Sequence, residues 1–258
     1  MPATPPVVLS IAGYDPSSGA GVTADIKTIA AHGCYGITCI TALTIQTTQG
    51  VSGVEPVRAE VVRRTLEELA GDFGIAAVRI GMLGSGDVAA AVSDFLQLAQ
   101  LKNVVLDPIV KSSSGTDLID ARGQQILRER LLKLADVVTP NVDEAAVLTG
   151  LSDRREGAKQ LHDLGAKVVV VTGGHLQQAV DLLYHNGEFE ELKAPKIQSR
   201  STHGTGCAFA TAIACELAKG NPVRDAVISA KAYVRDAILR AYPIGKGTGP
   251  LNHLPFAK

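Results

Sequence analysis

A repeated alternation of short apolar segments with segments of helical spacing constrains this chain most strongly. The runs Val7–Ala12, Val104–Leu106 and Lys167–Val171 are apolar almost throughout, which is typical of strands buried on both faces. Segments with one apolar side, such as Arg58–Ala70 and Asp87–Leu98, lie between runs of this kind. This order predicts an α/β fold whose mostly parallel sheet is covered by helices on both faces.

The remaining predicted elements follow the same order. Further strands are expected at Gly36–Ile45, Ala77–Ile80 and Val137–Thr139, with a hairpin of 179–184 and 189–192 around Asn186-Gly187. Further helices are expected at Val22–His32, Ala121–Leu134, Cys207–Ala218 and Val223–Ala241, with two short ones after Asn141. The segment from Gln46 to Gly50 is expected to be an uncharged polar loop.

Length and charge narrow the class of protein. The 258 residues fit one larger α/β domain, so we expect a single domain over residues 1–258. With 25 Lys and Arg against 26 Asp and Glu, no overall charge favours nucleic acid or an anionic membrane. The amino terminus has no basic head followed by an apolar core, and no apolar run has the length of a membrane span. We therefore expect a cytoplasmic protein without a nucleic-acid or membrane partner, and leave a homodimer open.

Unusual residues recur where the predicted strands end. Ligands bind beyond the carboxyl ends of strands in open α/β sheets, whereas stability alone would not gather such residues at one edge. They are Gly13, Gln46, Met82, Asp107, Asn141 and Gly173. This edge is therefore the predicted binding site.

The segment His203–Cys207 precedes a small and apolar helix that we expect to be buried. Gly204, Thr205 and Gly206 would leave free backbone N–H groups at the positive end of the helix dipole, which favours an anion. Cys207 would lie in the first turn, where a thiol ionises most easily. On these residues alone, two glycines that only turn the chain and a packing cysteine explain the segment equally well.

The segment Asp15–Gly21, here called the glycine-containing loop, invites comparison with a nucleotide-binding loop because it has glycines at positions 19 and 21. It fits neither the Walker A pattern nor the dinucleotide fingerprint, so a nucleotide must be held elsewhere.

The four cysteines show no spacing typical of zinc, and we interpret them as reduced thiols.

Ordered motifs from residue 11 to residue 250 resemble the hydroxymethylpyrimidine and phosphomethylpyrimidine kinases of thiamine biosynthesis. The resemblance is carried by Ile11–Ser17 with Gly19, Gly21 and Asp25, Thr41–Leu43 with Gln46, Ile80–Leu83, Val105–Pro108, Thr139–Asn141 with Glu144, Gly173–His175, Thr202–Cys207 and Gly245–Pro250. This family is part of the ribokinase-like superfamily. The resemblance implies a three-layer α/β/α sandwich and an enzyme that transfers the γ-phosphoryl group of ATP with Mg²⁺. It also implies two successive phosphorylations of one pyrimidine, first at a hydroxymethyl group and then at the phosphate just formed.

The resemblance also implies roles for individual residues. The catalytic group is the anion-binding turn Gly204, Thr205 and Gly206 with Cys207, which stands where the wider superfamily carries an aspartate base. The substrate pocket is formed by Gly13, Asp25, Gln46, Met82 and Ile109, with Gln46 facing an aminopyrimidine and Asp25 the hydroxymethyl group. The nucleotide is bound by Asn141, Glu144, Thr172, Gly173 and Gly174. Mg²⁺ is held by Asp107 and Glu144, whose carboxylate oxygens suit this ion directly or through water.

Some residues depart from the family pattern. Thr172 stands where lysine is common, Ser18 where glycine is usual and Thr23 where glutamine is usual. Two alternatives therefore stay open: a pyridoxal kinase of the same superfamily and a non-catalytic pyrimidine-binding protein.

Overall fold

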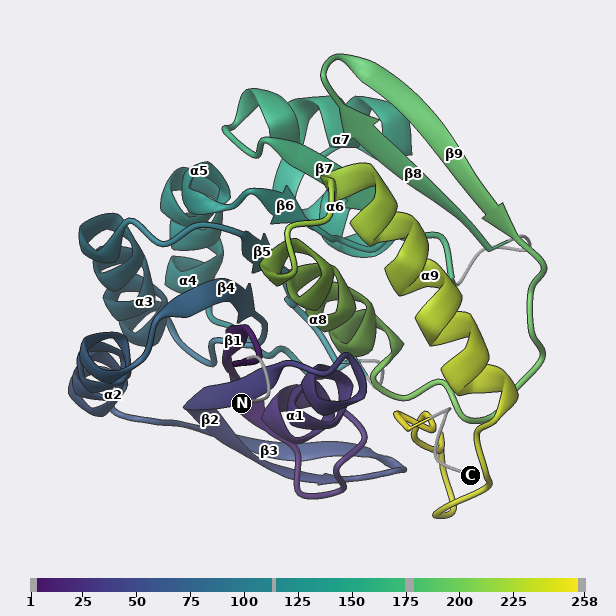
Figure 1. The fold of residues 1–258 in the computed structure, drawn as a ribbon, viewed down its shortest axis with the longest axis horizontal. Helices are drawn as coiled ribbons and strands as arrows, with labels where there is room; N and C mark the ends of the chain where they lie inside the picture. Colours follow the sequence, from purple (N-terminus) through teal and green to yellow (C-terminus); the bar gives the residue numbers. More distant parts are fainter. Residues whose placement is uncertain (1–3, 113–114, 175–178, 255–258) are drawn as a thin grey trace.

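The computed structural model describes residues 4–112, 115–174 and 179–254. Within these ranges, nine strands form one sheet in the order β3-β2-β1-β4-β5-β6-β7-β8-β9 (Figure 1). The strands are β1 (Val7–Tyr14), β2 (Tyr35–Thr47), β3 (Gly50–Pro56), β4 (Ile75–Ile80), β5 (Val104–Leu106), β6 (Val137–Val138), β7 (Val168–Val171), β8 (Ala179–His185) and β9 (Glu188–Ala194). The central strands β2, β1, β4, β5, β6 and β7 are parallel, and antiparallel strands extend the sheet at both edges.

Helices cover both faces of the sheet. They are α1 (Gly21–Ala31), α2 (Ala59–Asp72), α3 (Gly86–Ala99), α4 (Ala121–Ile126), a π-helical segment η1 (Leu127–Leu131), α5 (Leu132–Leu134), α6 (Val142–Thr149), α7 (Arg154–Asp163), α8 (Thr205–Ala218) and α9 (Val223–Leu239). One apolar core joins the sheet to α2 through α7, and a second joins it to α1, α8 and α9. The fold is therefore the expected three-layer α/β/α sandwich.

The continuous apolar strands explain this layering. Successive side chains of a strand point to opposite faces, so a strand between two helical layers must be apolar at every position. In β5, Leu106 belongs to the core under α2 through α7, whereas Val105 belongs to the core under α1, α8 and α9. The same alternation holds in β7 for Val169 and Val170.

The predicted loop Gln46–Gly50 is reduced to a turn at Thr48 and Gln49. Strand β2 continues through Thr47 and pairs antiparallel with β3, a strand that the sequence analysis did not predict. Gln46 therefore projects from a strand, two residues after Thr44 on the same side of β2. The two valines of β3, Val51 and Val54, lie three positions apart among glycines, so the strand has no apolar alternation from which it could be predicted.

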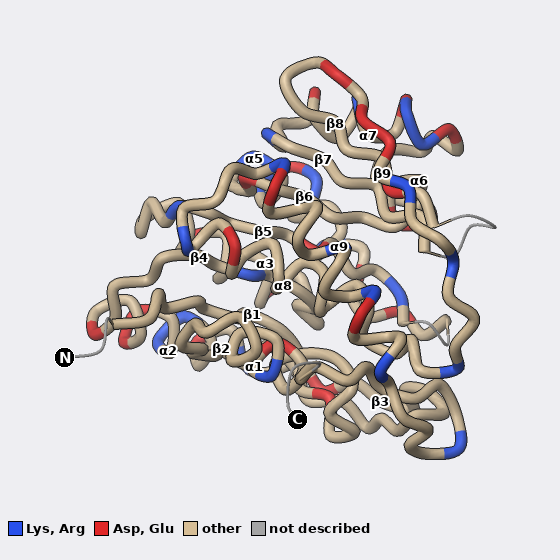
Figure 2. The backbone as a smooth tube through the Cα atoms, turned by 45° about the vertical axis from the view of Figure 1, so that its right-hand side comes forward, with Lys and Arg blue, Asp and Glu red and all other residues tan. Residues whose placement is uncertain are grey.

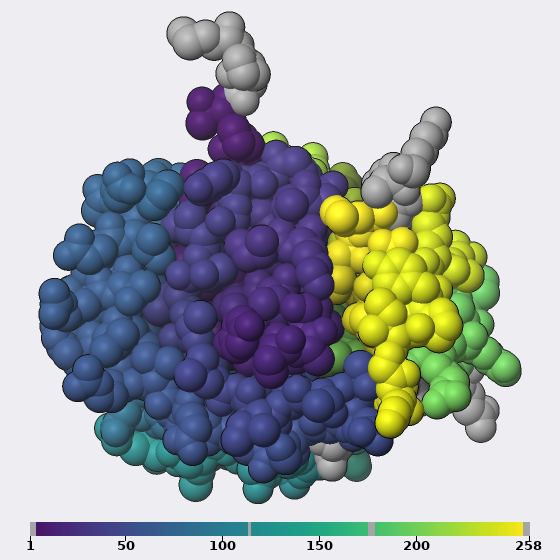
Figure 3. Space-filling view, turned by 90° about the horizontal axis from the view of Figure 1, so that it is seen from below, coloured from purple at the N-terminus to yellow at the C-terminus, as the bar shows by residue number. Residues whose placement is uncertain are grey.

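The tip of the β2–β3 hairpin lies against the carboxyl-terminal part of the chain. The Gly247 amide donates to Thr48 Oγ1 at 3.2 Å, and the Thr248 amide donates to the Thr48 carbonyl at 2.8 Å. The Gly249 carbonyl in turn accepts from the His203 amide at 3.0 Å. In Figure 3, seen from below, the blue amino-terminal third and the yellow carboxyl-terminal segment adjoin. These contacts connect the hairpin to the segment that leads into α8.

Other boundaries differ slightly from the predicted ones. Helix α8 begins at Thr205 rather than Cys207, and η1 interrupts the helix expected over 121–134. The predicted turn between β8 and β9 is confirmed, with positive φ at both Asn186 (53°) and Gly187 (80°).

Acidic and basic residues are mixed along the chain, as their nearly equal numbers predict. In the view of Figure 2, basic and acidic residues are interspersed along the tube. Among the described residues, no helix combines the length and the apolar character that crossing a membrane requires.

Candidate active site

The amino end of α8 is open to solvent at the carboxyl edge of the sheet. Gly204 caps the helix with a φ of 81°, and Gly206 in the first turn is exposed. The first amides of a helix have no partner within the helix, and the helix dipole adds positive potential there. A β-carbon on Gly206 would have Asp107 Oδ2 as its nearest neighbour, at 3.9 Å. The site thus combines free amide groups with a carboxylate beside them.

The glycine-containing loop before α1 packs directly against this helix end. Asp15 organises the loop by accepting hydrogen bonds from the amides of Ser17, Gly19 and Ala20 at 2.8, 3.2 and 2.9 Å. A β-carbon on Gly19 would come within 2.2 Å of the His203 ring, so glycine is required for this approach. The loop and the amino end of α8 therefore form one wall of the site.

Arg79 lies beneath the site and is completely buried. Its guanidinium donates to Asp25 Oδ2 at 3.1 Å and to Asp107 Oδ2 at 2.7 Å, so one cation bridges two carboxylates. Ser10 and Thr211 also donate to Asp25, at 2.6 and 2.8 Å. Burial of charge is tolerated here because each ion is paired and hydrogen-bonded.

This arrangement corrects the substrate role expected for Asp25. The residue is fully buried, and both its carboxylate oxygens accept hydrogen bonds from protein groups. Asp25 therefore has no surface for the hydroxymethyl group and holds Arg79 in place instead.

The thiol of Cys207 also differs from expectation. Burial raises its pKa to about 11, although the Arg79 charge and the Gly21 amide favour the thiolate. Asp107 and Asp25 act in the same direction as burial. The thiol is therefore neutral near pH 7, and the position in the first turn of α8 does not lower its pKa as predicted.

Asp107 and Glu144 form an acidic pair that suits a divalent cation. Burial raises the pKa of Asp107 to about 6, and burial with the Asp107 charge raises that of Glu144 to about 8. Glu144 also forms a capping box with Asn141, whose side chain accepts from the Glu144 amide at 2.8 Å. Two buried carboxylates that repel one another are stabilised by a hard cation. Among the described residues no group of three or more acidic, His or Cys side chains could hold a metal.

Three of the predicted pocket residues gather beside β1 and β2. A β-carbon on Gly13 would meet Met82 Sδ at 2.9 Å, so glycine leaves space for that side chain. Met82 forms a small apolar cluster with Ala42 and Leu118, and the half-buried Ile109 packs on it. The structure thus brings Gly13, Met82 and Ile109 together.

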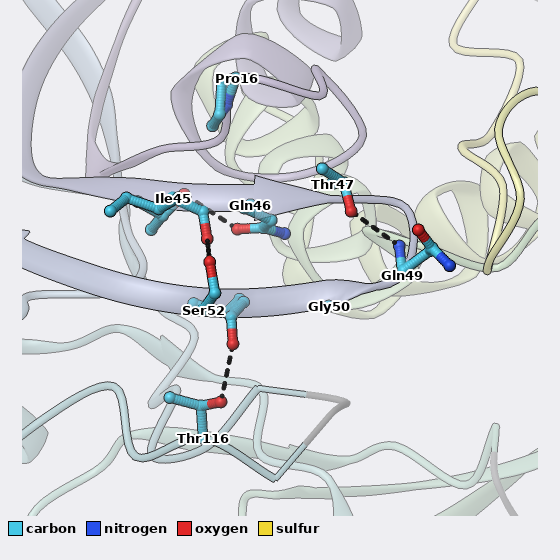
Figure 4. Close-up of a pocket in the computed structure, with 10 residues that line it drawn as sticks. Pro16, Ile45, Gln46, Thr47, Gln49, Gly50, Ser52 and Thr116 are labelled. Carbon is cyan, nitrogen blue, oxygen red and sulfur yellow. Dashed lines mark hydrogen bonds between the residues drawn. The ribbon is translucent and has the colours of Figure 1, made fainter.

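Gln46 lies at the open side of this region. A cavity of about 580 Å³ runs along the β2–β3 hairpin and is lined by Gln46 (Figure 4). Gln46 Nε2 is 3.1 Å from His203 Nε2, and His203 directly precedes Gly204. His203 therefore links the predicted pyrimidine-binding residue to the amino end of α8.

The predicted nucleotide turn follows β7. The Thr172 amide donates to the Pro140 carbonyl at 2.8 Å, which places the turn beside Asn141. The Gly173 amide donates to Asp181 Oδ1 at 2.9 Å, and Lys231 of α9 donates to the other oxygen of Asp181 at 2.6 Å. Gly174 is exposed, and His175 lies outside the described residues.

Sequence reasoning assigned no role to Arg79, Asp15 or His203. Arg79 carries the one signal that could have shown its importance, because it is a charged residue within an apolar strand. Asp15 looked like an ordinary turn residue, and only the fold brings it to His203.

The fold and these residues define a phosphotransferase of the ribokinase-like class. The family model described as Phosphomethylpyrimidine kinase matches residues 15–252, and the chain belongs to this family.

Two curated relatives are named for thiamine biosynthesis, whereas a solved structure of the same fold is a pyridoxal kinase. The chain is 42% identical over 258 residues to a hydroxymethylpyrimidine/phosphomethylpyrimidine kinase of Streptomyces coelicolor, covering 98% of this chain and 96% of that protein. It is 44% identical to the thiamine biosynthesis bifunctional protein ThiED of Geobacter sulfurreducens and covers 97% of this chain but 53% of that protein. Pyridoxal kinase of Bacillus subtilis, solved as an ADP complex, has a TM-score of 0.88 at 36% identity and covers 97% of this chain and 98% of that chain.

Proposed function

We propose that this protein uses ATP to phosphorylate 4-amino-5-hydroxymethyl-2-methylpyrimidine and then its monophosphate, giving the diphosphate used in thiamine biosynthesis. The observation that carries the proposal is the open amino end of α8, which lies beside Asp107 and is joined to Gln46 through His203. Phosphoryl transfer needs in-line alignment and stabilisation of negative charge, and it leaves little covalent chemistry to the protein. The free amides at the amino end of α8 stabilise the negative charge, and Gln46 holds the pyrimidine in line with the phosphoryl group.

In the first step, the hydroxymethyl oxygen attacks the γ-phosphorus of ATP, ADP leaves and the hydroxyl proton is lost. The amides of Gly206 and Cys207 stabilise the oxygens of the transferred group, whereas the Thr205 amide donates to the Thr202 carbonyl at 3.4 Å. We assign Cys207 as the proton acceptor for this step. Because its thiol is neutral near pH 7, only a small thiolate fraction can accept the proton, which limits the contribution of Cys207 to at most about 10², the lower end of general-base catalysis. In the second step an anionic phosphate oxygen attacks a second ATP and needs no base.

The remaining residues bind the two substrates. Asp107 and Glu144 would hold Mg²⁺, which neutralises phosphate charge when bound, and Asn141 orients Glu144 through the capping box. Thr172, Gly173 and Gly174 provide a turn for the nucleotide beside Asn141. Gln46 faces the pyrimidine ring, and Gly13, Met82 and Ile109 pack against it.

The location and assembly are also part of the proposal. All four cysteines are free thiols in the structure, as in proteins of a reducing compartment, and we propose the cytoplasm. We propose small molecules as the binding partners, without nucleic acid or membrane, and leave a homodimer open.

A coupled assay of ADP release tests the proposal. Three substrates should be compared: the hydroxymethylpyrimidine, its monophosphate and pyridoxal. We expect ADP release with both pyrimidines and a higher kcat/KM for them than for pyridoxal. Preference for pyridoxal would instead support the second candidate, which the likeness to the Bacillus subtilis pyridoxal kinase favours. No ADP release with any substrate would favour a non-catalytic pyrimidine-binding protein.

A further inference from the structure

Four polar side chains, those of Asp15, His203, Gln46 and Thr44, form a chain from the glycine-containing loop to the Tyr14 carbonyl. His203 Nε2 lies 2.8 Å from Asp15 Oδ2 and 3.1 Å from Gln46 Nε2. Gln46 Oε1 is 3.0 Å from Thr44 Oγ1, which is also 2.9 Å from the Tyr14 carbonyl oxygen. Each of these groups has a fixed number of polar hydrogens, so the donor or acceptor role of one group determines the role of its neighbour.

The contact between Asp15 and His203 determines which ring nitrogen of His203 carries a hydrogen. Asp15 accepts from three backbone amides and the Ser17 hydroxyl. Although burial opposes it, hydrogen bonds from His203 and Ser17 keep the pKa of Asp15 below its ordinary value. An ionised carboxylate only accepts, so His203 Nε2 must carry a hydrogen and donate it to Asp15.

A protonated Nε2 cannot also accept from the amide nitrogen of Gln46. With nitrogen facing nitrogen, two N–H groups would oppose one another at 3.1 Å. Thr44 shows a matching conflict, because its single hydroxyl hydrogen cannot serve both the Tyr14 carbonyl and Gln46 Oε1. A half turn of the Gln46 amide exchanges its oxygen and nitrogen and removes both conflicts.

We propose that His203, held by Asp15, is a positioning residue that fixes the Gln46 amide with its oxygen toward His203 and its nitrogen toward Thr44. In this orientation His203 Nε2–H is shared between Asp15 and Gln46, Gln46 donates to Thr44, and Thr44 donates to Tyr14. The inner hydrogen and inner lone pair of the amide are then used by the protein. One N–H and one oxygen lone pair remain for a ligand, on the outer edge of the amide.

This outer edge determines which ring is preferred. A ring nitrogen next to an amino group offers one acceptor and one donor side by side, and this pair matches the free N–H and carbonyl of Gln46. The inference rests on the proposed function, and it makes the amino group of the pyrimidine the feature that Gln46 recognises. A ring without that group loses one of the two hydrogen bonds.

Kinetics with two substrates and three variants test the inference. The substrates are the hydroxymethylpyrimidine and its analogue without the amino group. His203→Phe keeps a ring packed on Gly19 but removes the hydrogen-bond donor. His203→Gln restores an N–H near the position of Nε2. Thr44→Val removes the hydrogen bond between Thr44 Oγ1 and the Gln46 amide.

We expect His203→Phe to raise KM for the amino compound about tenfold, with kcat and the KM of the analogue nearly unchanged. His203→Gln should recover most of this loss, and Thr44→Val should show a smaller rise of the same kind. An equal rise in KM for both substrates, or no recovery in His203→Gln, would overturn the inference.

A measurement without turnover separates this inference from the proposed function. The ¹⁵N spectrum of the His203 ring in the intact protein should show a protonated Nε2 at neutral pH, whereas an unprotonated Nε2 would overturn the relay. If wild-type protein does not phosphorylate the pyrimidine, the proposed function fails, while the ring spectrum still decides whether His203 donates to Asp15.

Discussion

Gly204 lies so close to Gly19 that a β-carbon on Gly204 would come within 1.9 Å of the Gly19 carbonyl oxygen. This contact joins the loop before α1 to the amino end of α8, two segments from opposite ends of the chain. A φ of 81° at Gly204 adds a second reason for glycine at this position. The contact holds the amino end of α8 next to the glycine-containing loop.

Gly206 gives the sharper test of this helix end. A β-carbon there would meet only Asp107 Oδ2, at 3.9 Å, so Gly206→Ala should fold normally. Its methyl group would occupy the space in front of the free amides. We expect kcat to fall by about tenfold to a hundredfold with little change in the KM of the pyrimidine, because charge stabilisation acts mainly in the transition state.

Gly71→Ala is the matched control. Gly71 lies in α2, and a β-carbon there would meet nothing within 4 Å. This variant should keep wild-type kcat and gain slightly in thermal stability. Unchanged kcat in Gly206→Ala would remove the helix end from the mechanism.

Cys207→Ala should separate the two phosphorylations. Loss of a proton acceptor should lower the rate on the hydroxymethyl compound by up to about 10²-fold, whereas the monophosphate has an anionic oxygen and should be affected much less. The rates are measured separately with each substrate at saturation. Equal losses in both steps would assign Cys207 to packing, as the high pKa of its thiol also permits.

The buried bridge of Asp25, Arg79 and Asp107 should dominate stability in this region. Asp25→Asn leaves the Arg79 guanidinium with one carboxylate instead of two. Removing one partner of a buried ion pair costs about 3 kcal/mol, which corresponds to roughly 10 °C in Tm. Thermal unfolding followed by circular dichroism measures the change.

Arg63 offers a control for this prediction. It pairs with Glu60 and Glu67 on the exposed surface of α2, so Arg63→Ala should leave Tm almost unchanged. Similar losses in the two variants would show that burial does not determine the strength of these pairs.

The layers of the fold could be predicted from the sequence because buried parallel strands are apolar at every position. The edge strand β3 could not, since it has no regular alternation of apolar and polar residues and its pairing depends on β2. Likewise the helix of Cys207 was predicted, but the direction of its pKa shift was not. Burial and the charges of Asp25, Arg79 and Asp107 come from segments far apart in the sequence, and only the fold brings them together.

The backbone at Ser18 explains why the family usually has glycine at this position. Its φ is 61°, a conformation that glycine adopts without strain. The usual glycine at this position therefore reflects backbone conformation, which a single sequence does not reveal.

His253 should make the free energy of unfolding depend on pH. Burial, helped by the charges of Lys27 and His203, lowers its pKa to about 4 from an ordinary value of 6.5. Its Nδ1 contacts Thr28 Oγ1 at 3.1 Å, and its Nε2 has no hydrogen-bond partner among the described residues. The unfolded chain therefore binds the proton more readily than the folded protein does.

The contribution of His253 to the free energy of unfolding should consequently be fully present above pH 6.5. It should decrease by at most about 3 kcal/mol as the pH falls from 6.5 to 4. His253→Leu should remove that part of the pH dependence in urea unfolding measured at several pH values. If wild-type protein and the variant lose stability in parallel over this range, His253 does not titrate as described.

The position of the γ-phosphoryl group in a ternary complex tests the central claim most directly. A crystal structure with a non-hydrolysable ATP analogue and the hydroxymethylpyrimidine would show it. We predict γ-phosphoryl oxygens about 3 Å from the amides of Gly206 and Cys207, with the hydroxymethyl oxygen on the opposite side of the phosphorus from the leaving group. A γ-phosphoryl group bound away from the amino end of α8 would contradict the account.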